Sequence, residues 1–239
     1  MSCPAGKKIG TVSEPITSPD GKFMVFLPSG WTMDKKHPVC LFLHGAGGVA
    51  NVNNIRTQSL TRMLLTQEYA DKVEHIVLIP VAPSRGWLDK FPFVMSLVDM
   101  AISELNGDPN RVALAGQSMG GNGAWNLATQ HPDRFCAVVP ICGFAGQGKG
   151  EDLPPALVSA LVSKPLWVFH SEDDTIVSVE NSDRIVDALK AAGATDATLK
   201  YTRYPPGVTP QAGPLVGHAS YELAFADEGL WPWMSSHRR

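Results

Sequence analysis

Short apolar runs recur along the chain and alternate with amphipathic stretches. The runs that we interpret as strands cover residues 22–28, 39–45, 75–83, 111–117, 135–143, 165–170 and 197–205. Between them, helical patterns cover residues 94–105, 119–130 and 179–192. Strands that are apolar on both faces and alternate with helices predict an α/β protein, with a mostly parallel central sheet and helices on both faces.

Polar residues follow several of these predicted strands. Ser118 comes just after the strand 111–117, the stretch HSEDD begins at the end of the strand 165–170, and His218 lies on a proline-rich loop after the last strand. Ligands of such sheets bind at the carboxyl ends of the strands. A serine, an acid and a histidine in this order therefore predict a catalytic triad.

Glycines surround Ser118 in the stretch GQSMGGNG. A strand precedes the serine and a helix follows it. A nucleophile on such a turn has a strained backbone, and side chains at positions 116 and 120 would collide with the neighbouring strand and helix. We predict that Ser118 is the nucleophile; the alternative is that it only caps the helix.

The stretch HGAGG (44–48) follows an earlier strand. Its small residues leave backbone N–H groups free to point into a site, which predicts an oxyanion hole. We expect its donors to be the N–H groups of Met119 and Ala46, with Gly47 as the alternative to Ala46. A plain glycine-rich turn is the other interpretation. His44 is expected to brace this loop by hydrogen bonding.

Among the seven histidines, His218 is the expected base, because Gly217 before it gives its loop freedom to bring the ring to Ser118. The alternative is a histidine on a surface loop. The acid belongs to a row of three carboxylates, at residues 172–174. The run of three carboxylates does not by itself show which of them is the acid of the triad.

The segments HGAGG, GQSMGG, HSEDDTIV and GHASYELAF, in this order, resemble the α/β-hydrolase superfamily. The chain is similar to its small capless esterases, which include the dienelactone-hydrolase, acyl-thioesterase and polyhydroxybutyrate-depolymerase-like groups and the "predicted peptidase" members. The resemblance covers about Phe23 to Trp233. It implies an α/β-hydrolase fold without a large cap domain, and it selects Asp174 as the acid, four residues after His170 and three before Val177.

We expect residues 1–239 to form one domain, with an irregular N-terminal segment over 1–20. The short N-terminus predicts that the first antiparallel strand or two of the family's sheet are missing. The connection 144–164 has room for one short helix, which predicts an open cleft. Trp87, just after a strand, and Gln117, beside the nucleophile, are expected to contact the substrate; a core position for Trp87 is the alternative.

The expected reaction is hydrolysis of carboxylic esters with small or accessible acyl groups, in small-molecule or polymeric substrates. A thioesterase or peptidase of the same fold is the alternative within the enzyme class. A non-catalytic binding module of the same fold is the alternative outside it. That last reading is weakened because such proteins typically lose a triad member, whereas this chain has all three.

Composition narrows the class of partner. Charged residues make up 18% of the chain and the net charge is −3, without a basic stripe, which argues against nucleic acid as a partner. The apolar runs are too short to span a membrane. With no apolar leader segment visible, we expect a cytoplasmic protein if the numbering starts at the native N-terminus.

No cofactor or metal is expected, since no HExxH or other ligand spacing occurs. The cysteines at positions 3, 40, 136 and 142 are expected to be free thiols, with a Cys136–Cys142 bridge as the alternative. Oligomeric state is not indicated by the sequence.

Overall fold

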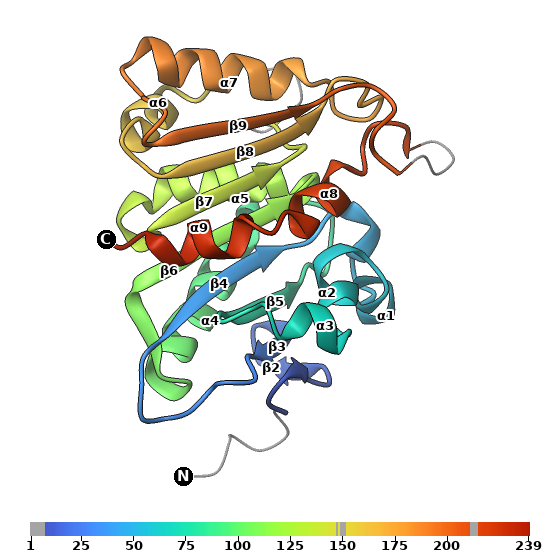
Figure 1. The fold of residues 1–239 in the computed structure, drawn as a ribbon, viewed down its shortest axis with the longest axis vertical. Coiled ribbons are helices and arrows are strands. Elements are labelled where there is room, and N and C mark those ends of the chain that lie inside the picture. Colours follow the sequence, from blue (N-terminus) through green and yellow to red (C-terminus); the bar gives the residue numbers. More distant parts are fainter. Residues whose placement is uncertain (1–7, 147, 149–151, 211–214) are drawn as a thin grey trace.

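A nine-stranded sheet forms the centre of the computed structural model, which describes residues 8–146, 148, 152–210 and 215–239. The strands are β1 (Thr11–Val12), β2 (Ile16–Ser18), β3 (Gly21–Leu27), β4 (His37–Leu43), β5 (Ile76–Val81), β6 (Gly107–Gln117), β7 (Ala137–Ile141), β8 (Leu166–Ser171) and β9 (Leu199–Tyr204). Their order is β1-β3-β5-β4-β6-β7-β8-β9, and β2 pairs with β3 (Figure 1). Neighbours from β5 to β9 are parallel, whereas β3 runs antiparallel to β5.

The helices lie on both faces of this sheet (Figure 1). They are α1 (Val52–Arg56), α2 (Ser59–Leu64), α3 (Gln67–Ala70), α4 (Phe91–Glu104), α5 (Met119–Gln130), α6 (Pro155–Leu161), α7 (Glu180–Ala191), α8 (Ser220–Ala226) and α9 (Leu230–Ser236). Buried side chains of α4, α5, α6 and α7 share one hydrophobic core, and those of α1, α2, α3, α8 and α9 share a second. The predicted α/β architecture is therefore confirmed.

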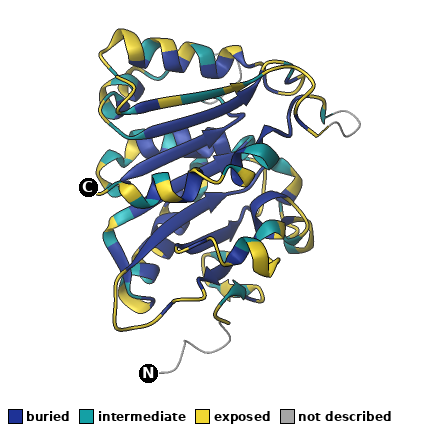
Figure 2. Cartoon of the chain, viewed as in Figure 1, coloured by how far each residue is buried: buried dark blue, intermediate teal, exposed yellow. Residues whose placement is uncertain are grey.

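Strand β3 shows how one segment serves both cores. Phe23, Val25 and Leu27 belong to the first core, while Met24 and Phe26 belong to the second. Successive side chains of a strand point to opposite faces, so an unbroken apolar run is what a sheet covered on both sides requires. Figure 2 shows this burial along the central strands, whereas exposed residues lie on outer helix surfaces, in loops and on strands such as the edge strand β9.

The N-terminal segment differs from the expectation. Residues 1–20 were expected to be irregular, but the short strands β1 and β2 both lie in this range and pair antiparallel with β3. The expected loss of the first antiparallel strands is therefore also wrong for this part of the chain. Two and three residues are too few to show a period of two, and neighbouring β3 is what holds these strands in place.

Two further expectations concern the cysteines and the absence of membrane-spanning helices. Cys40, Cys136 and Cys142 are buried free thiols, so the alternative bridge is not formed; Cys3 lies outside the described residues. Of the helices that the structure describes, none has the length and apolar character needed to cross a membrane.

Candidate active site

Ser118 occupies the turn between β6 and α5 with a backbone conformation that few non-glycine residues adopt. Its φ is 54° and its ψ is −115°. Its N–H donates to the carbonyl of Ile141 on β7 at 2.8 Å, which holds the turn against the neighbouring strand. A Cβ on Gly120 would overlap the carbonyl of Leu43, and one on Gly116 would overlap the carbonyl of Gly120. The glycines thus permit the strained turn that presents the hydroxyl.

The three residues of the predicted triad meet at the carboxyl edge of the sheet. Nε2 of His218 lies 2.8 Å from Oγ of Ser118, and its Nδ1 lies 2.7 Å from Oδ2 of Asp174. An ionised carboxylate can only accept, so Nδ1 carries the proton. Nε2 is then free to accept the serine proton, as a general base must.

The carboxylate of Asp174 is enclosed by donors. Its Oδ1 accepts the N–H groups of Ile176 at 2.8 Å and Val177 at 2.9 Å, and its Oδ2 accepts from His218 and, at 3.2 Å, from His170. Burial alone would raise the pKa of Asp174, but the hydrogen bonds from the two histidines and from Val177 outweigh it and hold the pKa well below its ordinary value. Asp174 is therefore a buried anion beside the imidazole of His218.

The neighbouring carboxylate points elsewhere. Oδ1 of Asp173 accepts from the Ser171 hydroxyl at 2.6 Å, and its Oδ2 accepts the N–H of Gly207 at 2.8 Å. Gly207 belongs to the segment after β9 that leads towards His218. Asp173 therefore holds this segment, whereas Asp174 bonds the imidazole.

Two backbone N–H groups are available beside Ser118. Ala46, in the turn Ala46–Gly48, lines the same cavity as Ser118 and Met119. In the part of the chain that the structure describes, the N–H groups of Ala46 and Met119 donate to no protein acceptor. Free donors in the cavity of a nucleophile are what an oxyanion hole requires. Among the described residues the N–H of Gly47 likewise donates to no acceptor, so it can also serve as a donor.

His44 braces the loop that carries Ala46. Its Nε2 accepts the N–H of Ala82 at 3.1 Å, so Nδ1 carries the proton and donates to the carbonyl of Gly45 at 2.6 Å. Burial lowers the pKa of His44 to about 4 although the bond to Gly45 acts in the opposite direction. The ring is therefore neutral at pH 7 and acts as a structural hydrogen-bonding group.

A cavity of about 610 Å³ opens next to the nucleophile. This volume suits a small ligand. Its lining consists of Ala46, Arg85, Gly86, Leu88, Asp89, Ser118, Met119, Asn122, Phe144, Ile176 and Val177. The sequence analysis did not predict several of these residues as part of the site. For Phe144 and Asn122 a signal was available, because they follow the carboxyl ends of β7 and β6.

The two predicted substrate contacts lie outside this cavity. Trp87 is fully buried, and its Nε1–H donates to the carbonyl of His44 at 3.1 Å, so it anchors the loop whose neighbours Gly86 and Leu88 do line the cavity. Gln117 lines a separate cavity of about 10 Å³, together with Ser59 and other residues. Both expectations are corrected, because each side chain turns inward under the loop instead of towards Ser118.

The triad overlaps the one group of potential metal ligands found among the described residues. The donor atoms of Cys142, Asp174 and His218 lie within 4.8 Å of one another. Both ring nitrogens of His218 already bond protein partners, and burial, with the charge of Asp174, raises the pKa of the Cys142 thiol far above its ordinary value. A metal ion bound to His218 would have to replace one of these hydrogen bonds, so the residues fit acid–base chemistry better than metal binding.

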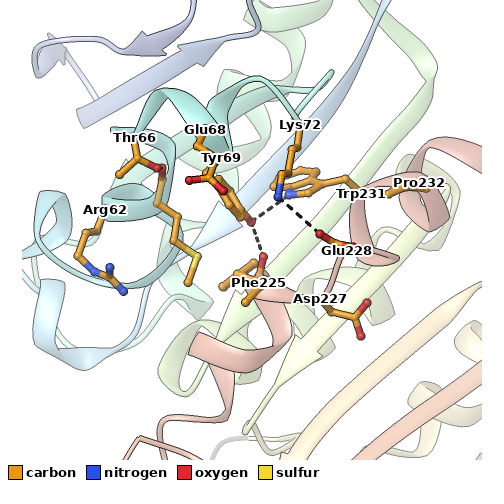
Figure 3. A pocket seen from close by; sticks show the side chains of 12 residues that line it. Arg62, Thr66, Glu68, Tyr69, Lys72, Phe225, Asp227, Glu228, Trp231 and Pro232 are labelled. Atoms are coloured by element: carbon orange, nitrogen blue, oxygen red, sulfur yellow. Dashed lines mark hydrogen bonds and ion pairs between the residues drawn. The ribbon is translucent and has the colours of Figure 1, made fainter.

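A second cavity, of about 400 Å³, lies between α2–α3 and α8–α9 and contains none of the predicted site residues (Figure 3). Its main polar groups bond one another: Tyr69 Oη donates to the carbonyl of Phe225 at 2.5 Å and accepts from Trp231 Nε1 at 3.0 Å, and Lys72 pairs with Glu228 at 3.6 Å (Figure 3). These contacts join the helices on this face of the sheet.

Comparison with known proteins identifies the family of this chain. The family described as "Putative esterase" matches residues 15–190. A solved structure of a thermostable esterase is 27% identical, with a TM-score of 0.78 over 95% of this chain. The chain spans 62% of the length of that esterase.

More distant structures share the fold. A substrate-bound, fluorophosphonate-binding serine hydrolase of Staphylococcus aureus is 16% identical, with a TM-score of 0.69 over 95% of this chain and 99% of its own. A ferulic acid esterase of Anaeromyces mucronatus is 15% identical, with a TM-score of 0.66 over 98% of this chain and 95% of its own. At these identities the match concerns the fold alone, which is the predicted mostly parallel sheet with helices on both faces.

Proposed function

The chain belongs to this esterase family, and from that premise we propose that it hydrolyses carboxylic esters through an acyl-enzyme formed on Ser118. The observation that carries the proposal is the unbroken hydrogen-bonded line from Ser118 Oγ through His218 to Asp174, at 2.8 and 2.7 Å. Nucleophile, base and orienting acid in this order form the constellation of serine acyl transfer.

The reaction follows from these positions. His218 Nε2 takes the proton of Ser118 while Oγ bonds to the carbonyl carbon of the ester. The carbonyl oxygen becomes an oxyanion, which the N–H groups of Ala46 and Met119 stabilise. His218 then gives its proton to the departing alcohol as the bond between the acyl carbon and that alcohol breaks, which leaves the acyl-enzyme.

Deacylation reverses the proton transfers with water in place of the alcohol. Water gives a proton to His218 Nε2 and bonds to the acyl carbon. His218 returns the proton to Ser118 Oγ as the carboxylic acid leaves. Asp174 stabilises the imidazolium in both halves and stays ionised throughout, because its hydrogen bonds hold its pKa below the ordinary value.

The cavity supports small or accessible acyl groups as substrates. Leu88, Met119, Phe144, Ile176 and Val177 supply apolar wall next to Ser118. The connection between β7 and β8 holds the seven-residue helix α6 as its described helix, so it offers no large cap. A wall of this size suits an acyl group of a few carbons better than a long lipid chain.

A cytoplasmic location is part of the proposal. The buried free thiols of Cys40, Cys136 and Cys142 support it, because free thiols are typical of a reducing compartment.

A fluorophosphonate probe tests the mechanism directly. Wild-type protein should be labelled on Ser118 and should hydrolyse p-nitrophenyl acetate. Ser118→Ala should lose the label and nearly all turnover, leaving the roughly 10³-fold acceleration over water that the oxyanion hole and binding supply. A panel of matched esters, thioesters and peptides separates ester hydrolysis from the other acyl transfers, and turnover of Ser118→Ala at the wild-type rate would refute the proposal.

A further inference from the structure

We propose that His170 is a positioning residue of the triad, which holds the carboxylate of Asp174 in the orientation that His218 needs and is itself held by Ser182 on α7. This inference rests on the proposed function. It concerns a buried histidine that lies at the end of β8 and does not touch Ser118. The claim is that activity depends on a donor at Nε2 of this ring.

The contacts of His170 determine which nitrogen carries a proton. Nε2 lies 2.8 Å from the carbonyl oxygen of Val177 and 3.2 Å from Oδ2 of Asp174. Both partners are acceptors, so Nε2 must be the N–H donor, shared between them. On the other side of the ring, Nδ1 lies 2.8 Å from Oγ of Ser182, whose hydroxyl can donate to it.

These bonds close the turn that carries the acid. Val177 follows Asp174 by three residues, and the ring of His170 spans the turn from the end of β8 to the Val177 carbonyl. The N–H of Val177 meanwhile donates to Oδ1 of Asp174. The ring thus joins the strand, the acid and the far end of the turn, while Ser182 ties it to α7.

The carboxylate of Asp174 has two ends with different support. Oδ1 is fixed by two backbone N–H groups, whereas Oδ2 is fixed by the side chains of His170 and His218. Without His170, the one hydrogen bond left at Oδ2 from the described residues is that of His218, the ring that Asp174 orients. The side chains of His170 and Asp174 are both fully buried, so bulk water is not at hand to replace the lost donor. A misplaced carboxylate then orients His218 less well towards Ser118.

A catalytic role for His170 itself does not fit the geometry. The ring bonded to Ser118 Oγ is that of His218, at 2.8 Å. Both nitrogens of His170 are already bonded to protein groups, and His170 itself does not line the cavity. Its effect on the reaction must therefore pass through Asp174.

The first test compares two substitutions at the same position. His170→Leu removes the donor and should lower kcat for p-nitrophenyl acetate by about 10- to 100-fold with little change in KM, since a small misplacement of a catalytic group has effects of this size. His170→Gln places an amide N–H near the position of Nε2 and should recover most of that loss. Ser182→Ala, which leaves the ring in place, should cost only a few-fold.

A double-mutant cycle separates positioning from a general structural role. If His170 acts through the acid, His170→Leu should change the fluorophosphonate labelling rate by less than about twofold in an Asp174→Asn background, because effects of residues in one unit are not additive. A merely structural histidine would slow labelling equally in both backgrounds, and that outcome would overturn the proposal. Wild-type kcat in folded His170→Leu would overturn it as well.

Two controls keep the test interpretable. Circular dichroism and the unfolding midpoint show whether each variant is folded. If His170→Leu does not fold, the kcat values of His170→Gln and Ser182→Ala are compared instead. The proposal then fails if kcat of His170→Gln is lower than that of Ser182→Ala by tenfold or more. Ser118→Ala reports on the proposed function separately. If that variant kept full turnover, the serine mechanism would fail irrespective of the results at His170.

Discussion

Replacing Asp174 by asparagine should reduce kcat by up to about 10⁴-fold, equivalent to about 5.4 kcal/mol of transition-state stabilisation. The hydrogen bonds around the carboxylate explain this size. All of its hydrogen-bond partners among the described residues are donors: two backbone N–H groups at Oδ1 and the rings of His170 and His218 at Oδ2. An asparagine has one oxygen and one NH₂ group, so it can satisfy only one of these two sides.

Both orientations of the amide are unfavourable. With its oxygen towards the backbone N–H groups, the NH₂ group faces His170 and His218; it opposes the N–H of His170 and forces His218 to accept at Nδ1. The proton of His218 then sits on Nε2, which is the atom that must accept from Ser118. With the amide flipped, the NH₂ group faces the N–H groups of Ile176 and Val177, which lose their acceptor on residue 174 at a cost of about 1–3 kcal/mol each.

Asp173→Asn is the matched control, one residue away on the same turn. Its carboxylate accepts from Ser171 and Gly207 instead of a catalytic ring. We expect kcat within about tenfold of wild type, because the loss of one hydrogen bond of about 1 kcal/mol weakens the loop without changing the tautomer of His218.

The assay is kcat for p-nitrophenyl acetate at neutral pH for both single variants, with folding checked by circular dichroism. The reasoning is refuted if the ranking is reversed, or if Asp174→Asn retains more than about a tenth of wild-type kcat. In the first case the acid would be Asp173; in the second, the tautomer of His218 would not depend on this carboxylate.

Three further predictions concern stability, substrate and metal. Burial lowers the pKa of His44 to about 4 and that of His75 to about 3, so below about pH 6.5 the unfolded chain binds more protons than the folded chain. The free energy of unfolding, measured in urea, should therefore fall by about 2 kcal/mol for each histidine between pH 7 and pH 5. A free energy of unfolding that stays constant over this range would contradict the prediction. Acetyl to butyryl p-nitrophenyl esters should exceed palmitoyl esters in kcat/KM, since each methylene contributes about 0.8 kcal/mol only where apolar wall receives it; a steady rise through C12 would reveal a buried acyl tunnel. EDTA should leave turnover unchanged, and a loss that zinc restores would show a metal requirement.

The sequence by itself determined the elements whose signal is local. Apolar runs predicted strands β3 to β9, and the helical spacing predicted α4, α5 and α7, because burial on two faces or along one stripe leaves its period in the chain. The turn around Ser118 was predictable because the glycines that it requires, at positions 116 and 120, stand beside the serine in the sequence.

Only the tertiary structure decided where side chains point within the site. Trp87 and Gln117 stand beside strand ends, as substrate contacts would, yet Trp87 turns inward because its indole N–H finds the carbonyl of His44, 43 residues earlier in the chain. The bond from His170 to Asp174 likewise depends on a turn that closes through Val177. Hydrogen-bond partners of buried polar groups are chosen by the packing of distant segments, and no period in the sequence records that choice.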